Sequence, residues 1–162
     1  INLFTRMSPA SAAFCLSRTW LALEGVALCE AALDASIKYA KERIQFGKPI
    51  GKFQMVQDRI YRMMSLMETS RLLSYRALSL VEKGSIDARM MSSLAKAYAC
   101  DAAVKVTYDG MQIYGGNGLS EDYPLERYFR DARILTIGDG TSDIQKLVVG
   151  RELFGKGFSA YE

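Results

Sequence analysis

The spacing of apolar residues predicts three long helices, at residues 14–43, 53–83 and 86–114. In each of them apolar side chains recur at intervals of three and four residues, as a helix with one buried face requires. Breaks rich in glycine follow each of the three. We expect the following residues to face inward: Leu28, Ala32, Ala35 and Tyr39; Phe53, Val56, Ile60, Met63 and Met67; and Met90, Leu94, Ala97, Val104, Tyr108 and Met111.

Two shorter helices are expected nearer the C-terminus. One begins with a proline in its first turn and covers residues 124–131, and the other covers residues 143–154. Ser142 and Gln145 have the spacing of a capping box at the start of the last helix. Four principal helices, one short extra helix and short connections predict an all-α, antiparallel up-and-down four-helix bundle, with no strand pattern to compete. The residues after Gly155 are expected to be frayed.

The composition predicts one soluble domain over residues 1–162. Hydrophobic residues make up 49% and charged residues 24% of the chain, which excludes disorder. The lack of a run of about 18 apolar residues argues against a membrane span. A net charge of +3 with both signs mixed predicts no nucleic-acid partner. Because the chain begins without methionine or a signal peptide, we interpret it as a piece of a longer protein that is not secreted.

The sequence contains no histidine. This excludes nucleophile pairs of the Ser-His and Cys-His type and most zinc sites, so proton transfer has to use a carboxylate, a lysine or a tyrosine. Cys15, Cys29 and Cys100 lack the spacing of a metal site and are too few for a disulfide framework. We therefore expect three reduced, buried thiols and no metal.

Asp139 is the candidate catalytic residue. It lies between Gly138 and Gly140 directly before a helix start, so its carboxylate is on a loop that a packed helix holds in place. A carboxylate held in this way is suited to act as a base. The alternative is an ordinary helix-capping loop with a solvated aspartate, and this stretch alone does not decide between them.

The turn after the first helix, at residues 43–54, has a composition suited to a nucleotide. An arginine, a glutamine and two aromatic residues around a glycine turn could hold an anionic phosphate and a flat ring together. A helix–helix turn with an aromatic plug is an equal alternative on these grounds.

Four motifs, taken together and in order, resemble one family, the acyl-CoA dehydrogenases. They are R-x-x-F-G-K-x-I-x-x-F-Q at residues 43–54, MQIYGGNG at residues 111–118, YFRDAR at residues 128–133 and D-G-T-S-x-I-Q at residues 139–145. The resemblance runs from about residue 14 to residue 155 and covers only the C-terminal helical domain of that family. The family's N-terminal helical domain and middle β-domain have no counterpart in the chain.

The resemblance implies an FAD-dependent oxidation of an acyl-CoA thioester to its 2,3-enoyl form. In the family a carboxylate removes the α-proton while the β-hydrogen leaves as hydride to N5 of FAD. A homo-oligomer (dimer or tetramer), an electron-transfer flavoprotein or similar acceptor, and a location in the bacterial cytoplasm or the mitochondrial matrix are also implied. The alternatives are an acyl-CoA oxidase or a flavin monooxygenase on the same scaffold, or an oligomerising bundle that is inactive as an isolated fragment.

Carried over position by position, the resemblance assigns roles to individual residues. Asp139 occupies the position of the base. Arg43 and Gln45 match the pair that reaches the flavin pyrophosphate of a neighbouring subunit. The segment at the adenosine end is matched by Gln112, Ile113, Gly115 and Gly116. The full set implied in FAD binding is Arg43, Gln45, Phe46, Phe53, Gln54, Gln112, Ile113, Gly115, Gly116, Thr141 and Asp143, and the set implied in substrate binding is Arg18 and Gly140.

One departure concerns the base, because many members have glutamate where this chain has Asp139. Aspartate withdraws the carboxylate by one methylene, about 1.5 Å, and misplacing a catalytic group by 1 Å can cost about 100-fold in rate. Some members that act on alicyclic acyl-CoAs resemble this chain in using aspartate, so we expect a ring substrate. Other members carry the base at the position of Ser17, which cannot serve. An Asp139 side chain turned out into solvent, far from the first turn and the end of the third helix, would leave only a scaffold.

Overall fold

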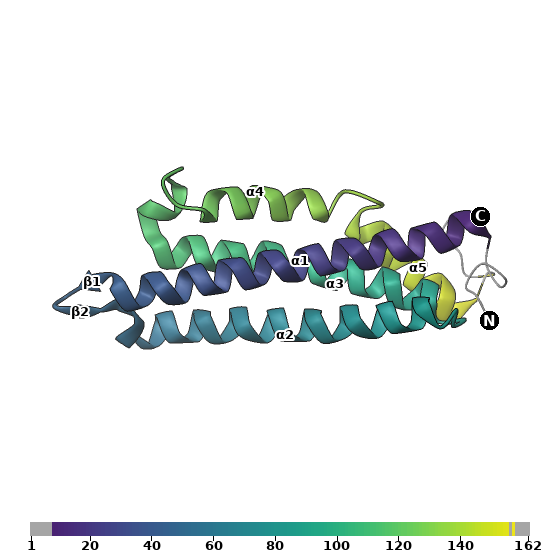
Figure 1. Ribbon diagram of the computed structural model, residues 1–162, viewed down its shortest axis with the longest axis horizontal. Coiled ribbons are helices and arrows are strands. Elements are labelled where there is room, and N and C mark those ends of the chain that lie inside the picture. The colour runs from purple at the N-terminus through teal and green to yellow at the C-terminus, as the bar shows by residue number, and fades with distance from the viewer. Residues whose placement is uncertain (1–7, 156, 158–162) are drawn as a thin grey trace.

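Five α-helices make up most of the described chain. The computed structural model describes residues 8–155 and 157, and its helices are α1 (Pro9–Glu42), α2 (Gln54–Glu82), α3 (Ala88–Tyr114), α4 (Leu125–Leu135) and α5 (Ser142–Phe154). They confirm the all-α fold class and each of the five predicted helices (Figure 1). The fraying predicted after Gly155 concerns residues that, except for Gly157, lie outside the described part of the chain.

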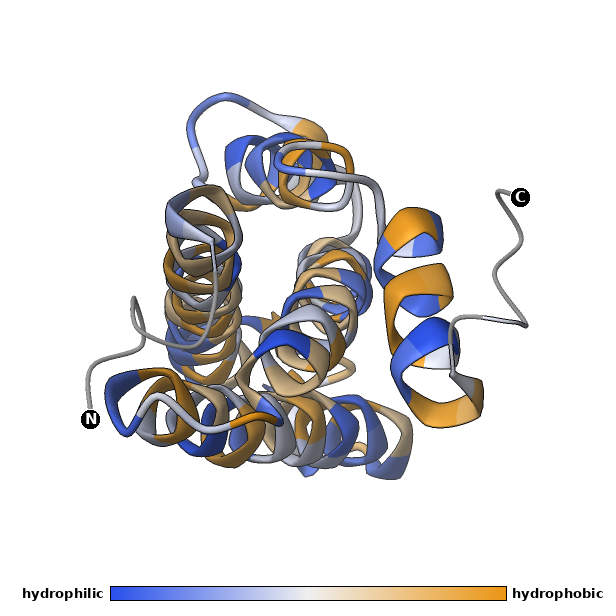
Figure 2. Ribbon diagram, turned by 90° about the vertical axis from the view of Figure 1, so that its right-hand side faces the viewer, coloured by the Kyte–Doolittle hydropathy of each residue, from blue (hydrophilic) through white to orange (hydrophobic). Residues whose placement is uncertain are grey.

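Helix α3 lies at the centre of the bundle. Viewed end-on, the other four helices surround α3, and each of them contacts it (Figure 2). Helix α4 runs alongside α1 and α3, back toward the end of the bundle at which α1 begins, and α5 packs against α3 there (Figure 1). The chain therefore places the beginning of α1 and the α4–α5 loop at one end, and the α1–α2 turn and the end of α3 at the other.

Helix α1 begins about five residues earlier than predicted. The side chain of Ser8 accepts a hydrogen bond from the N–H of Ser11, and Pro9 occupies the first helical position. Both are signals of a helix start. By length and composition α1 could cross a membrane, a test that the core helix of a bundle passes as well. Its buried side chains pack against those of α2 and α3.

A short β-hairpin joins α1 to α2, so the prediction of no strand is wrong at this point. Strand β1 (Ile44–Gln45) pairs antiparallel with β2 (Lys48–Pro49), and the 3-10 helix η2 (Ile50–Lys52) follows. Phe46 and Gly47 between the strands have positive φ angles of 50° and 75°, which a two-residue I′ turn requires. Strands of two residues are too short for an alternating pattern to reveal them.

Helices α1 and α3 approach each other closely in the core. A Cβ atom at Gly25 would lie 3.0 Å from the carbonyl oxygen of Ala99, so the two backbones nearly touch. Further alanines of α3, at Ala95, Ala102 and Ala103, are buried as well. Small side chains on both helices therefore permit this approach.

Most residues predicted to face inward do so, and two do not. All those predicted for α1 and α2 are buried or half-buried, as are Met90, Ala97, Val104 and Met111 of α3. Leu94 and Tyr108 are 38% and 57% exposed, so these two predictions are wrong. Because α3 contacts four helices, its alanines lie where the neighbouring helices come close. The larger Leu94 and Tyr108 lie at the edges of these contacts, where solvent reaches them.

All three cysteines are buried, free thiols, as predicted. Burial raises the pKa of Cys29 and of Cys100 to about 12 and also raises the pKa of Cys15. The thiols therefore stay protonated near neutral pH and contribute as small apolar side chains.

The close contact of α1 with α3 predicts the effect of enlarging Gly25. Gly25→Leu should lower the free energy of unfolding by about 1–3 kcal/mol, because the new side chain would overlap the Ala99 carbonyl. Ala27→Leu, at an exposed position of the same helix, should change it by less than about 0.5 kcal/mol. Urea denaturation measures both, and equal values for the two variants would contradict the close contact.

Candidate active site

The loop between α4 and α5 carries the candidate base. Asp139 has a positive φ of 53° and the next residue, Gly140, a φ of 87°. Thr141 is the N-cap of α5, and its hydroxyl oxygen accepts a hydrogen bond from the N–H of Ile144 at 3.3 Å. The loop therefore turns sharply into a capped helix.

The predicted capping box is wrong. Ser142 is the first residue of α5, not its cap, and its hydroxyl donates to Asp101 Oδ1 on α3 at 2.7 Å. Gln145 is fully buried and does not reach the backbone of Ser142 in the described contacts. Its Nε2 donates instead to the carbonyl oxygens of Asp139 and Gly140 at 3.1 and 3.2 Å. Ser142 thus joins the start of α5 to α3, and Gln145 joins the Asp139–Gly140 loop to α5.

The Asp139 carboxylate faces α1. It is half-buried, and its Oδ2 accepts a hydrogen bond of 2.7 Å from the hydroxyl of Ser17. This contact joins the two positions at which the sequence analysis placed a base in different family members. It argues against the alternative of a freely solvated aspartate in a capping loop.

Arg18, the next residue of α1, adds positive charge beside the loop. Its Nη1 donates to the Ser93 hydroxyl at 3.1 Å, and its guanidinium carbon lies 5.4 Å from the centre of the Phe14 ring. Burial lowers the pKa of Arg18, while the charge of Asp139 acts in the opposite direction. Its Nε is buried without a hydrogen-bond partner among the described residues. This donor of the predicted substrate-binding residue is thus enclosed by the protein and left without a hydrogen bond among the described residues.

Lys96 is a member of the site that the sequence analysis missed. It is fully buried on α3, and its Nζ donates to the Gly140 carbonyl oxygen at 2.8 Å. The signal was present, because Ser92, Lys96, Ala99 and Ala103 follow one another at intervals of four, three and four residues, and all four are fully buried. A lysine within such a stripe stands out against its small neighbours. We call Ser17, Arg18, Lys96, Asp139, Gly140 and Gln145 the base-loop cluster.

A second group of predicted residues meets at the opposite end of the bundle. The hairpin after α1 and the end of α3 enclose a cleft of about 270 Å³. Its lining includes five of the predicted FAD residues, which we call the hairpin cluster: Arg43, Gln45, Ile113, Gly115 and Gly116. In the described part of the chain no carboxylate lies within 4.0 Å of the Arg43 guanidinium, so its charge is open to an anion.

The aromatic residues of the hairpin do not form a plug. Phe46 is 85% exposed and meets the half-buried Phe53 edge-on, with 6.3 Å between ring centres. The alternative of an aromatic plug is therefore not supported. Gln54 is exposed at the first position of α2 and does not line the cleft.

Gln112 lies in a second cleft, on the other side of the same glycine pair. This cleft measures about 510 Å³ and is lined by Tyr108, Met111, Gln112, Gly115, Gly116, Leu119 and Phe129. Gly115 and Gly116 lie in the 3-10 helix η3 (Gly115–Leu119), and a Cβ atom at either would meet nothing within 4 Å. A ligand could therefore approach the backbone closely here.

Asp143 and Thr141 line a small polar cleft beside the base loop, of about 220 Å³. Asp143 is exposed on the first turn of α5 and forms an ion pair with Lys146 at 3.3 Å. Of the predicted FAD residues, these two are the ones on the base-loop side of the bundle.

The two clusters are far apart within one chain. Ser17 and Arg43 both belong to α1 and its C-terminal cap, and a rise of about 1.5 Å per residue separates them by about 39 Å. The hydrogen bond from Ser17 shows that the Asp139 side chain is not turned out into solvent. The expectation that it lies near the first turn and the end of α3 is wrong, because both of these are at the other end of the bundle. One bound dinucleotide cannot extend from one cluster to the other.

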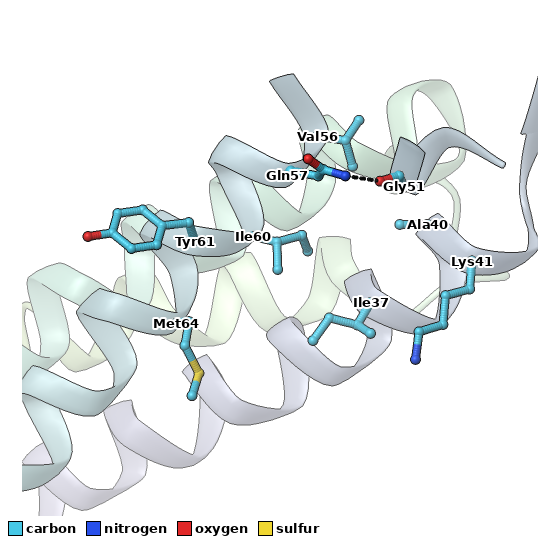
Figure 3. A pocket seen from close by; sticks show the side chains of 9 residues that line it. All are labelled: Ile37, Ala40, Lys41, Gly51, Val56, Gln57, Ile60, Tyr61 and Met64. Atoms are coloured by element: carbon cyan, nitrogen blue, oxygen red, sulfur yellow. Dashed lines mark hydrogen bonds between the residues drawn. The ribbon is translucent and has the colours of Figure 1, made fainter. Parts of the chain in front are cut away.

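An apolar groove between α1 and α2 is separate from both clusters. It measures about 410 Å³, and Ile37, Ile60 and Met64 point toward the space between the helices (Figure 3). None of its nine lining residues is a carboxylate, and Gln57 uses its Nε2 to bind the Gly51 carbonyl oxygen at 3.0 Å. The groove therefore has no carboxylate to act as a base.

Comparison with known proteins identifies the family. The family described as acyl-CoA dehydrogenase, C-terminal domain, matches residues 7–154. The chain belongs to the acyl-CoA dehydrogenase family. It is 40% identical over 140 residues to an acyl-CoA dehydrogenase of Bacillus subtilis, covering 86% of this chain and 37% of that protein. It is 38% identical, with the same coverage, to a cyclohexane-1-carbonyl-CoA dehydrogenase of Geobacter metallireducens.

A solved structure of the family has the same fold. The butyryl-CoA dehydrogenase of Megasphaera elsdenii superimposes with a TM-score of 0.86 at 37% identity, covering 89% of this chain and 37% of that one. The chain thus spans a little over a third of the length of these acyl-CoA dehydrogenases.

The geometry of the base loop predicts the effect of a methyl group at Gly140. Gly140→Ala should lower the free energy of unfolding by about 1–2 kcal/mol, because a left-handed φ disfavours alanine. A Cβ atom there would also lie 2.7 Å from the Gln145 Nε2. The control is Gly150→Ala, where a Cβ atom within α5 meets nothing within 4 Å and helix propensity should raise stability by up to about 1 kcal/mol. Thermal unfolding tests both, and a stable Gly140→Ala variant would argue against this loop geometry.

Proposed function

We propose that this chain is the C-terminal domain of an FAD-dependent acyl-CoA dehydrogenase whose base is Asp139. The observation that carries the proposal is the half-buried Asp139 carboxylate, held at 2.7 Å by Ser17 beside Arg18. In a chain without histidine, a carboxylate held in place is a suitable acceptor for the α-proton of a thioester. FAD, when bound, supplies the acceptor for the hydride that leaves the β-carbon.

The two carboxylate oxygens of Asp139 take different roles. Oδ2 accepts the hydrogen bond from Ser17, which leaves Oδ1 to receive the α-proton. Arg18 lies beside the carboxylate, and its guanidinium group binds the acyl-CoA near its thioester. The buried Gln145 holds the two carbonyl oxygens behind the carboxylate and keeps it directed at α1.

The residues of the hairpin cluster fit the phosphate-bearing part of FAD. Arg43 offers an unpaired cation, and the open backbone at Gly115 and Gly116 admits a close ligand. Since about 39 Å of α1 separates this cluster from the base loop, we propose that each chain serves two FAD molecules. Thr141 and Asp143 contact its own FAD, and the hairpin cluster contacts that of a neighbouring subunit. A homodimer or homotetramer follows from this arrangement, and an electron-transfer flavoprotein or a similar acceptor reoxidises the flavin.

The short base supports an alicyclic acyl group as the substrate. With aspartate in place of glutamate, the acid reaches about 1.5 Å less far, so the α-carbon has to come closer to the loop. A relative at 38% identity is a cyclohexane-1-carbonyl-CoA dehydrogenase. A flavin monooxygenase on this scaffold has less support, because it needs no α-proton base; an acyl-CoA oxidase remains as the second candidate. Oxygen consumption distinguishes these enzymes from a dehydrogenase.

Removing the base tests the proposed reaction. In the intact, FAD-loaded protein, Asp139→Asn should slow the bleaching of the flavin by acyl-CoA by about 10²–10⁴-fold, because an amide cannot take up the α-proton. Asp131→Asn, on the exposed side of α4, is the matched control and should bleach at the wild-type rate. Stopped-flow absorbance measures both. Bleaching of Asp139→Asn at the wild-type rate would refute Asp139 as the base.

A panel of thioesters tests the proposed substrate. Cyclohexane-1-carbonyl-CoA should reduce the flavin of the intact protein at least about 10-fold faster than butyryl-CoA, because a misplacement of the reacting carbon by about 1 Å has a cost of that order or more. Single-turnover rates at saturating thioester give the comparison. A faster reaction with the linear thioester would replace the alicyclic proposal with a linear substrate.

A further inference from the structure

Lys96 is a buried lysine that the reaction proposed above does not use. Its side chain is fully buried on α3, and its Nζ donates to the carbonyl oxygen of Gly140 at 2.8 Å. Placing an ammonium group away from water is costly unless it is hydrogen-bonded and opposed by negative charge. A neutral donor would satisfy one carbonyl oxygen at lower cost, so the charge itself needs a reason.

The carbonyl group that Lys96 binds belongs to the residue next to the base. Asp139 and Gly140 have φ angles of 53° and 87°. For a residue other than glycine this region costs about 1–2 kcal/mol, and it persists only where the surroundings hold the backbone. Relaxation of Asp139 to a negative φ would turn its carboxylate away from Ser17.

Helix α3 holds the loop on both sides of Thr141. Lys96 binds the Gly140 carbonyl before it, and Asp101 accepts the hydrogen bond of the Ser142 hydroxyl after it, at 2.7 Å. Gln145 of α5 adds a second donor to the Gly140 carbonyl at 3.2 Å. The strained pair is thus fixed from α3 and from α5 together.

Negatively charged groups near Lys96 favour its charged form. Burial lowers the pKa of Lys96, whereas Cys100, Asp139 and Asp101 act in the opposite direction. The two carboxylates thus favour the charged form of Lys96, and one of them belongs to the base, while Arg18 opposes that form. Of the side chains that hold the loop, Gln145 is neutral and Asp101 is negative, so Lys96 is the one that brings positive charge to Asp139 from behind.

We propose that Lys96 is a positioning residue for the reaction: through the Gly140 carbonyl and its charge it holds the Asp139 carboxylate against Ser17, where the α-proton of the acyl-CoA is taken up. The role rests on the proposed function, since it has meaning only if Asp139 is the base. It predicts a loss in the chemical step and little change in the binding of acyl-CoA or FAD.

The test uses Lys96→Met, whose unbranched side chain is one atom shorter than that of lysine and lacks its charge and donor, in the intact FAD-loaded protein. Flavin reduction at saturating acyl-CoA should slow by about 10–100-fold, as expected for a base displaced by about 1 Å. The KM for acyl-CoA, the FAD content and the rate of reduction by dithionite, which needs no base, should stay within about two-fold of wild type. Lys105→Met, at an exposed position of the same helix, is the matched control and should leave all four unchanged. Lys96→Gln, which is neutral and too short to reach Gly140, should repeat the result and serves if Lys96→Met does not fold.

The outcomes separate the two proposals. If Asp139→Asn abolishes bleaching and Lys96→Met leaves it at the wild-type rate, the positioning role is wrong and the base assignment stands. If Asp139→Asn bleaches normally, the proposed function fails first. If both Lys96 variants lose FAD or do not accumulate as folded protein, Lys96 is a residue of the fold and the positioning role is overturned.

Discussion

The close approach of α1 to α3 is the constraint on which the base loop depends. At Gly25 the two backbones are held so near that a methyl group would lie 3.0 Å from the Ala99 carbonyl oxygen. Ser17 of α1 and Lys96 of α3 can then reach the same short loop, one at the carboxylate and one at the peptide behind it. A wider spacing of the two helices would remove either the Ser17 contact or the Lys96 contact from the loop. The alanines of α3 thus contribute to the site without touching it.

The base loop combines backbone strain with dense hydrogen bonding. Asp139 adopts a φ of 53°, and its neighbours on three helices hold it there: Ser17 on α1, Lys96 on α3 and Gln145 on α5. Strain at functional sites persists where the surroundings over-determine the backbone, and this loop fits that description. The charges on either side, Arg18 and Lys96, both lose solvation in the fold, and both have a lowered pKa for that reason.

Periodicity was sufficient to predict the fold class and the helices, because long helices with one buried face leave a repeated signal. It failed where the structure has no repeat. The hairpin at residues 44–49 is too short to show alternation, and the capping role of Ser142 was overridden by a tertiary contact with Asp101. Leu94 and Tyr108 were predicted to face inward because the pattern shows which side chains are apolar. It does not show that only small side chains fit where α3 contacts its neighbours closely.

The candidate site was predictable in part. The motif positions gave Asp139 and the hairpin residues, but the spacing of motifs along the sequence does not show that about 39 Å of helix separates them. Lys96 was missed because a lone lysine is usually a surface residue. Its place in a stripe of small buried residues was readable from the helical period, and that signal could have singled it out before any coordinates were known.

The length of α1 sets the distance between the base-loop cluster and the hairpin cluster. The helix is continuous over Pro9–Glu42, so the number of residues between Ser17 and Arg43 sets both the distance and the relative direction of what each end presents. Each added or deleted residue would rotate one end against the other by about 100° and shift it by about 1.5 Å. A change of seven residues, close to two full turns, would restore the direction and still displace the hairpin by about 10 Å. An insertion in α1 would therefore change how the two clusters are placed relative to each other, whereas an insertion in an ordinary surface helix has no such effect.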